Sequence, residues 1–289
     1  MIKIYFLTSA HFETCLWFRN DEDFKVAMNY VAIQAACFPQ VTVLAFILMS
    51  NHVHFVLRGR LEDVIAFMNQ FKHRYSLYFS LKYGVKELLR RNGVDIQLVE
   101  YQNDAIERTI AYVQMNSVAA NICSHASQYP WGTGGTFFNP ALPTGKLIGK
   151  MSKRARERLL HSEFDKLPDE WHLSDDGYIN PKEYVDVSGV ERLFKSPKRL
   201  NYFMNSSSKA KQINTSEKSL PAFRDQTLLA TLPDLYKSLY QKQSFNELNP
   251  DQKSDAVKQI HYRFSSDANQ IARVCGVTYA EAAHLLESL

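Results

Sequence analysis

The most informative part of this 289-residue chain is the stretch Met49-Ser50-Asn51-His52-Val53-His54-Phe55-Val56. From His52 onward it has the composition of a β-strand. Because strand side chains alternate between two faces, His52 and His54 share one face, and Val53 and Phe55 share the other. Two imidazoles side by side on a rigid strand supply half of the ligands of a divalent-metal site. Such a site needs further groups from elsewhere in the chain.

The elements around this stretch predict an α+β fold. The alternation and spacing of apolar residues predict strands at residues 2–8, 41–49, 52–58 and 94–99, and helices at about 21–39, 61–82 and 104–121. Gly84 and the pair Asn92-Gly93 predict a loop before the last strand. The order is βαββαβ followed by a helix. We therefore expect a ferredoxin-like antiparallel sheet with helices on one face, and the last helix lying across the histidines on the other.

The chain divides into three expected regions. Residues 1–125 form the first domain, and residues 126–219 are a loop-rich basic connection with short helices such as 151–161. Residues 220–289 have helical spacing and predict a C-terminal helical domain. Its last part, residues 267–289, reads as helix, glycine turn and helix, which suits a helix-turn-helix. A small helical bundle without a role in DNA binding is the alternative.

Bulk composition limits the class of protein. The chain is 45% hydrophobic, and its apolar runs are too short to span a bilayer. The N-terminus lacks the length and cleavage site of a signal peptide. Four scattered cysteines, with no CxxC pair, indicate a reducing compartment and no cysteine-based zinc site. We expect a cytoplasmic protein with no membrane partner.

Basic residues gather in two parts of the sequence, although the net charge is only +4. A net charge of this size does not by itself indicate a nucleic-acid partner. Local clusters can contact phosphates, or they can simply form a solvated face. The members that we expect to contact the phosphates of a nucleic acid are Lys72, Arg74, Lys150, Lys153, Arg154 and Arg156.

The predicted helix at 104–121 offers groups to complete the histidine site. Tyr112 and Asn116 are four residues apart, so they are neighbours on one helix face. If this helix lies across the sheet, the Tyr112 hydroxyl and the Asn116 carboxamide oxygen both come within reach of the histidines. Packing in the core is the ordinary role of such a tyrosine. Tyr75, Tyr78 and Tyr101 are alternative nucleophiles.

At these residues the sequence resembles a known family. Residues 44–56 resemble the His-hydrophobe-His (HUH) motif of single-tyrosine transposases, and more narrowly of the REP-associated tyrosine transposases and their insertion-sequence relatives. Residues 111–118 resemble the tyrosine helix of that family, and residues 129–132 (Tyr-Pro-Trp-Gly) resemble the motif that follows it. The resemblance covers roughly residues 1–140. At 116–121 the chain reads Asn-Ser-Val-Ala-Ala-Asn, where the family usually reads Asn-Pro-Val-Arg-Ala-Gly.

The resemblance implies an enzyme of mobile elements that nicks and transfers single-stranded DNA during transposition and recombination. Tyr112 would attack a phosphate in single-stranded or hairpin-bearing DNA, giving a 5′-phosphotyrosine and a free 3′-OH. His52, His54 and Asn116 would hold Mg²⁺ or Mn²⁺, and two imidazoles suit Mn²⁺ better. The family contains monomers and homodimers, so the resemblance allows both states.

Two other functions remain open. The loss of Pro and Arg after Asn116 favours a domesticated protein that binds DNA hairpins with little or no cleavage. In the other alternative, a metal-dependent nuclease activates water, and Tyr112 does not attack.

Overall fold

The computed structural model describes residues 1–9, 16–84, 94–120, 122–143, 145–164, 166–207, 223, 225–264 and 266–287. The strands are β1 (Lys3–Thr8), β2 (Thr42–Met49), β3 (His52–Gly59) and β4 (Asp95–Val99). The α-helices are α1 (Asp21–Cys37), α2 (Leu61–Tyr83), α3 (Ala105–Gln114), α4 (Asn116–Ala119), α5 (Lys153–Leu160), α6 (Val187–Phe194), α7 (Pro197–Ser206), α9 (Asp225–Tyr240), α10 (Pro250–Phe264), α11 (Ala268–Cys275) and α12 (Tyr279–Glu287).

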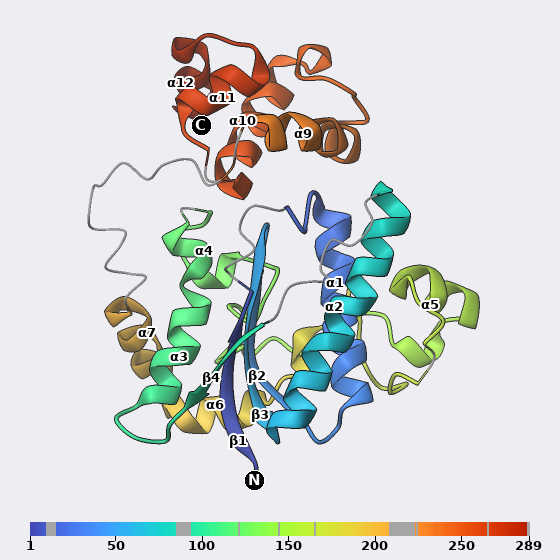
Figure 1. Cartoon of the computed structure of the whole chain (residues 1–289), viewed down its shortest axis with the longest axis vertical. Helices are drawn as coiled ribbons and strands as arrows, with labels where there is room; N and C mark the ends of the chain where they lie inside the picture. Colours follow the sequence, from blue (N-terminus) through green and yellow to red (C-terminus); the bar gives the residue numbers. More distant parts are fainter. Residues whose placement is uncertain are drawn as a thin grey trace.

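The four strands form one antiparallel sheet in the order β2-β3-β1-β4. The helices α1 and α2 cover one face, and α3 lies on the other (Figure 1). The expectation of a mixed fold with an antiparallel sheet is confirmed. The predicted helix at 104–121 is interrupted at Met115, between α3 and α4. The predicted loop at Asn92-Gly93 lies outside the described residues.

The hairpin of β2 and β3 sets the direction of the histidines. Met49 and His52 are paired across it, so Ser50 and Asn51 alone form the turn. Phe55 packs its ring against Phe71 of α2, with the ring centroids 5.6 Å apart. Because alternate strand residues face opposite ways, His52 and His54 point toward α3.

The outer edge of β2 is covered by the segment Trp131-Gly132-Thr133. The Leu48 N–H donates to the Trp131 carbonyl at 2.8 Å, and the Thr133 N–H donates to the Phe46 carbonyl at 3.0 Å. A Cβ on Gly132 would lie 2.7 Å from the Phe46 carbonyl oxygen, so this close approach requires glycine. The edge strand is thereby closed to pairing with other chains.

Buried side chains of the region after residue 126 belong to the same core as the sheet. They include Trp131, Ile148, Ile179, Phe194 and Phe203. The Trp131 ring stacks on that of Phe24 in α1, with the centroids 5.1 Å apart. The described residues between 126 and 207 include short helices, and their buried side chains pack as part of the first core.

The helices α9 to α12 form a second core and a separate group beyond the end of the sheet (Figure 1). Leu16, from the segment before α1, is buried in this second core. In the final helix pair, α11 ends at Gly276, which has a φ of +70°, and α12 follows. Within the described residues, no helix has the length and apolarity needed to cross a membrane.

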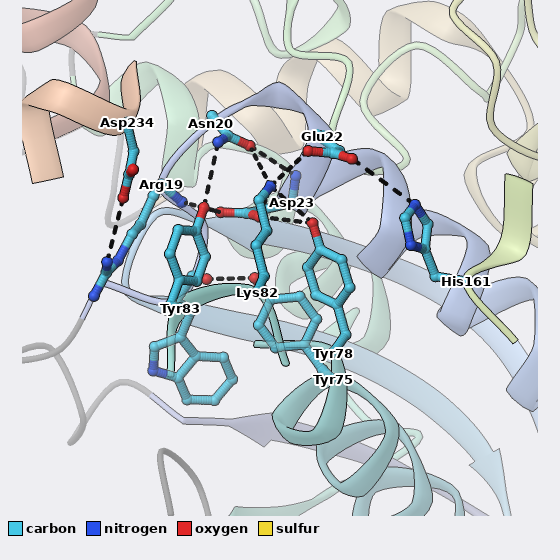
Figure 2. Close-up of polar contacts among 11 residues, drawn as sticks. Arg19, Asn20, Glu22, Asp23, Tyr75, Tyr78, Lys82, Tyr83, His161 and Asp234 are labelled. Carbon is cyan, nitrogen blue, oxygen red and sulfur yellow. Dashed lines mark hydrogen bonds and ion pairs between the residues drawn. The ribbon is translucent and has the colours of Figure 1, made fainter. Parts of the chain in front are cut away.

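A fully buried carboxylate joins the start of α1 to the end of α2 (Figure 2). Asp23 accepts hydrogen bonds from the hydroxyls of Tyr78 (2.9 Å) and Tyr83 (2.8 Å) and from the Lys82 ammonium (2.8 Å). The backbone N–H of Arg19 donates at 2.8 Å to Oδ2, the same carboxylate oxygen that accepts from Tyr83. Since a buried charge is costly unless it is paired and hydrogen-bonded, this network fixes the two helix ends to each other.

Candidate metal and nucleophile site

The two histidines of β3 lie edge to face on the α3 side of the sheet. Their ring centroids are 4.8 Å apart, and the rings meet at 77°. His54 is buried and His52 is half-buried. The Nδ1 atom of His52 lies 2.7 Å from the Asn51 carboxamide oxygen. In the neutral tautomer that donates from Nδ1 to this oxygen, the lone pair is on Nε2, as in metal-binding histidines held by an outer partner.

Tyr112 lies on the half of α3 that faces the histidines. Its ring centroid is 5.9 Å from that of His54, at an interplanar angle of 77°. Phe6 of β1 contacts both: its ring stacks on His54 with 5.5 Å between the centroids and meets Tyr112 edge-on at 5.8 Å. Tyr112 is partly exposed. The histidines and the tyrosine of one chain are therefore neighbours.

The Phe6 contact was not foreseen from the sequence, although a usable signal was present. Phe6 belongs to a strand that pairs directly with β3, where it lies opposite Val56. Residues paired in this way share a face, and alternation places Val56 on the face of His54. A prediction of strand order would have placed Phe6 there.

Asn116 begins α4, directly after the interruption of the helix. It is 3% exposed, and its amide nitrogen donates to the carbonyls of Tyr112 (2.9 Å) and Val113 (3.2 Å). Both amide hydrogens are used in holding the helix end, so only the carboxamide oxygen is available as a ligand. The predicted role of Asn116 as the third ligand remains a prediction.

The donor set fits a divalent cation with mixed nitrogen and oxygen ligands. Two imidazoles lie together, the phenol of Tyr112 on α3 packs against one of them, and the amide oxygen of Asn116 is at the start of α4. No group of three or more His, Cys, Asp or Glu side chains suited to a metal ion is found in the described part of the chain. A cation here would thus be held by few protein ligands, which leaves coordination positions for a substrate oxygen.

A buried hydrogen-bond latch fixes α3 to β2. Gln114 is 2% exposed, and its amide donates to the Thr133 hydroxyl at 2.8 Å. That hydroxyl donates to the Phe46 carbonyl and accepts from the Phe46 N–H, each at 3.1 Å. Thr133 directly follows the Tyr-Pro-Trp-Gly segment, and neither residue type nor spacing indicates its pairing with Gln114.

A cleft of about 750 Å³ adjoins Tyr112. It lies between β4, α3 and α7, and Phe6, Gln97, Arg108, Tyr112, Phe203 and Ser206 are among its lining residues. The Arg108 guanidinium is exposed and lies 5.7 Å from the centroid of the Phe203 ring. Arg108 precedes Tyr112 by four residues, so helical spacing alone puts it on the same face. Arg108 was not among the residues expected to contact DNA.

The basic residues expected to contact DNA lie elsewhere. Lys153, Arg154 and Arg156 are on α5, which Figure 1 places beside α1 and α2, across the sheet from α3. Arg156 pairs with Asp169 at 3.6 Å, and Lys150 is exposed just before α5. The structure does not bring this cluster to Tyr112.

The two remaining candidates are on α2. Lys72 is 8% exposed, and burial lowers the pKa of its ammonium. Arg74 donates to the Ser162 hydroxyl at 3.3 Å, and its guanidinium lies over the Phe164 ring. Both side chains are occupied in packing on the face opposite the histidines, and their predicted contact with DNA remains a prediction.

The alternative tyrosines differ sharply from Tyr112. Tyr75 is fully buried, and its hydroxyl donates to the Trp17 carbonyl. Tyr78 is bound to Asp23, and burial raises the pKa of its phenol. Tyr101 is 67% exposed, on the loop before α3. Tyr112 is the one of these four that packs against a strand histidine.

Comparisons with known proteins give one weak relation. No protein-family model matches the chain, and no curated protein sequence matches it. A solved structure of a REP-associated tyrosine transposase bound to a REP hairpin is similar to this protein. The matched region covers 45% of this chain and 76% of the transposase chain. The sequence identity is 13% and the TM-score is 0.33. At this level the similarity establishes neither a family nor a function.

Proposed function

We propose that this protein nicks and rejoins single-stranded DNA through a covalent bond to Tyr112, with a divalent cation held by His52 and His54. One observation carries the proposal: a partly exposed tyrosine on a helix packs against His54, whose ring lies beside that of His52 on a strand of the same chain. A buried latch and an aromatic contact hold the helix there. The order βαββαβ and the strand order β2-β3-β1-β4 support the finer assignment of the sheet to the ferredoxin-like arrangement.

The proposed reaction exchanges one phosphodiester for another. The Tyr112 oxygen forms a bond to phosphorus as its phenolic proton departs, the P–O3′ bond breaks, and the 3′ oxygen takes up a proton. The number of phosphodiester bonds is unchanged, so the reverse step rejoins the strand without a nucleotide cofactor. A cation at the histidine pair supplies Lewis-acid polarisation of the phosphoryl oxygens. His52, His54 and the Asn116 oxygen would hold it.

The cleft beside Tyr112 is the proposed path of the DNA strand. Ligand clefts commonly measure about 300–1,000 Å³, and this one opens at the nucleophile. Phe6 and Phe203 give it apolar and aromatic walls, and Arg108 supplies an exposed cation. Unpaired bases bind to such surfaces by stacking, without the need for a paired duplex. These features favour a single strand as the substrate.

An adduct assay tests the proposal. Purified protein is incubated with Mn²⁺ and a labelled single strand that carries a hairpin, and the products are separated under denaturing conditions. Wild-type protein should give a slower band in which the label is attached to protein. Tyr112→Phe and His52→Ala should abolish the band. The matched controls Tyr101→Phe and His73→Ala, both at exposed positions, should retain it.

The same assay separates the alternatives. A water-activating nuclease would produce shortened DNA without attached protein, and Tyr112→Phe would leave that activity intact. A protein that only binds hairpins would shift the DNA in a native gel and give no covalent band with any divalent metal. Persistence of the adduct in Tyr112→Phe would overturn the assignment of the nucleophile.

A further inference from the structure

The C-terminal helical unit contacts the turn that carries His52. Ser50 is 4% exposed and lies two residues before His52. Its hydroxyl donates to the carbonyl of Arg263 at 2.6 Å. Arg263 is in the last turn of α10, where the carbonyls have no partner within the helix. The turn of the β2–β3 hairpin thus supplies a hydrogen bond that the end of α10 requires.

The same serine is held from the other side by the first domain. The Ser50 carbonyl accepts hydrogen bonds from the N–H groups of Trp17 (2.8 Å) and Phe18 (3.1 Å). Leu16, directly before them, is buried in the core of the C-terminal unit. The turn and the segment before α1 therefore contact each other, and each of them also contacts the C-terminal helical unit.

Two ion pairs close this junction. The Arg263 guanidinium lies 2.7 Å from a carboxylate oxygen of Asp21, the first residue of α1. Arg19 pairs with Asp234 of α9 at 3.5 Å, and Figure 2 shows this contact beside the Asp23 network. Through Arg19 and Asp23 the C-terminal unit is linked to the ends of α1 and α2, so its position is fixed relative to the sheet.

From these contacts we infer that the C-terminal helical unit positions the proposed metal ligand His52, and that Ser50 is the positioning residue. Loss of the Ser50 hydroxyl removes the direct hydrogen bond between the turn and α10, and with it part of the support of Asn51, whose carboxamide oxygen lies 2.7 Å from Nδ1 of His52. Residues that orient a ligand change metal affinity without touching the metal. The inference rests on the proposed role of His52 as a ligand.

The test uses the full chain and Mn²⁺ alone. Binding is measured from the signal of free Mn²⁺ in electron paramagnetic resonance, without DNA. Ser50→Ala should weaken Mn²⁺ binding about tenfold, as loss of an orienting partner does elsewhere. Ser50→Thr retains the hydroxyl, so its Mn²⁺ affinity should be within about twofold of that of the wild-type protein. Arg273→Gln is the control. It removes an ion pair inside the C-terminal unit, in which Nε of Arg273 lies 2.6 Å from a carboxylate oxygen of Asp225, and it should leave Mn²⁺ affinity unchanged.

A second readout does not depend on the metal. The imidazole signal of His52 in the proton NMR spectrum should shift or broaden in Ser50→Ala, and that of His73 should not. Equal Mn²⁺ affinity together with an unchanged His52 signal in Ser50→Ala would overturn the inference. If wild type binds no Mn²⁺ but the His52 signal still responds, the positioning role stands and the proposed metal site fails.

Discussion

The latch between α3 and β2 gives a prediction whose size follows from its hydrogen bonds. Thr133→Val replaces a fully buried hydroxyl with a methyl group of similar shape. Two donors lose their acceptor: the Gln114 amide, at 2.8 Å, and the Phe46 N–H, at 3.1 Å. The Phe46 carbonyl keeps the Thr133 N–H at 3.0 Å. Each orphaned buried donor costs about 1–3 kcal/mol, and the added methyl returns about 0.8 kcal/mol.

We therefore expect Thr133→Val to lower the free energy of unfolding by about 1–5 kcal/mol, the cost of two orphaned donors less the gain from the methyl group. Urea unfolding followed by near-ultraviolet circular dichroism measures this change, because buried Trp131 adjoins the latch. Thr133→Ser keeps the hydroxyl and is the control, with a smaller loss. A change below about 0.5 kcal/mol in the valine variant, which is typical of neutral surface substitutions, would refute the account of the latch.

Three further predictions concern packing, pH and DNA. Gly132→Ala should cost about 1–3 kcal/mol in unfolding experiments, because its Cβ would lie 2.7 Å from the Phe46 carbonyl oxygen and backbone must move. Burial raises the pKa of Tyr30 and of Tyr178 to about 12. The stability that these two phenols provide is therefore full below pH 10 and is lost as the pH rises toward 12. Tyr30→Phe should reduce this loss of stability, as measured by the urea midpoint of unfolding between pH 10 and pH 12. Arg108→Gln should weaken binding of a short single strand and reduce its salt dependence by about one charge, as measured by fluorescence anisotropy.

Local patterns predicted the elements well and their surroundings less well. Alternation at Val53 and Phe55 placed the two histidines correctly on the face away from α2, since register in a half-buried strand follows the apolar side. The interruption at Met115 was not visible, because its cause lies in the Asn116 side chain bonding back to two carbonyls. Local side-chain bonds of this kind compete with helix continuation.

Long-range contacts were beyond the sequence patterns. Charge runs such as that of α5 identify a solvated surface, and they do not reveal which face of the sheet it covers. The hydrogen bond from Ser50 to Arg263 joins residues 213 positions apart, and neither residue type indicates the pairing. The Thr133 latch is hidden in the same way, because a buried threonine resembles any other residue of a loop.

The most direct test of the central claim is to identify the residue that carries DNA after the reaction. The covalent product formed with Mn²⁺ and a hairpin-bearing single strand is digested with nuclease and protease, and the modified peptide is sequenced by mass spectrometry. The account predicts a nucleotide joined through its 5′ phosphate to the oxygen of Tyr112. A nucleotide on another residue, or nicked DNA with no modified peptide, would contradict it.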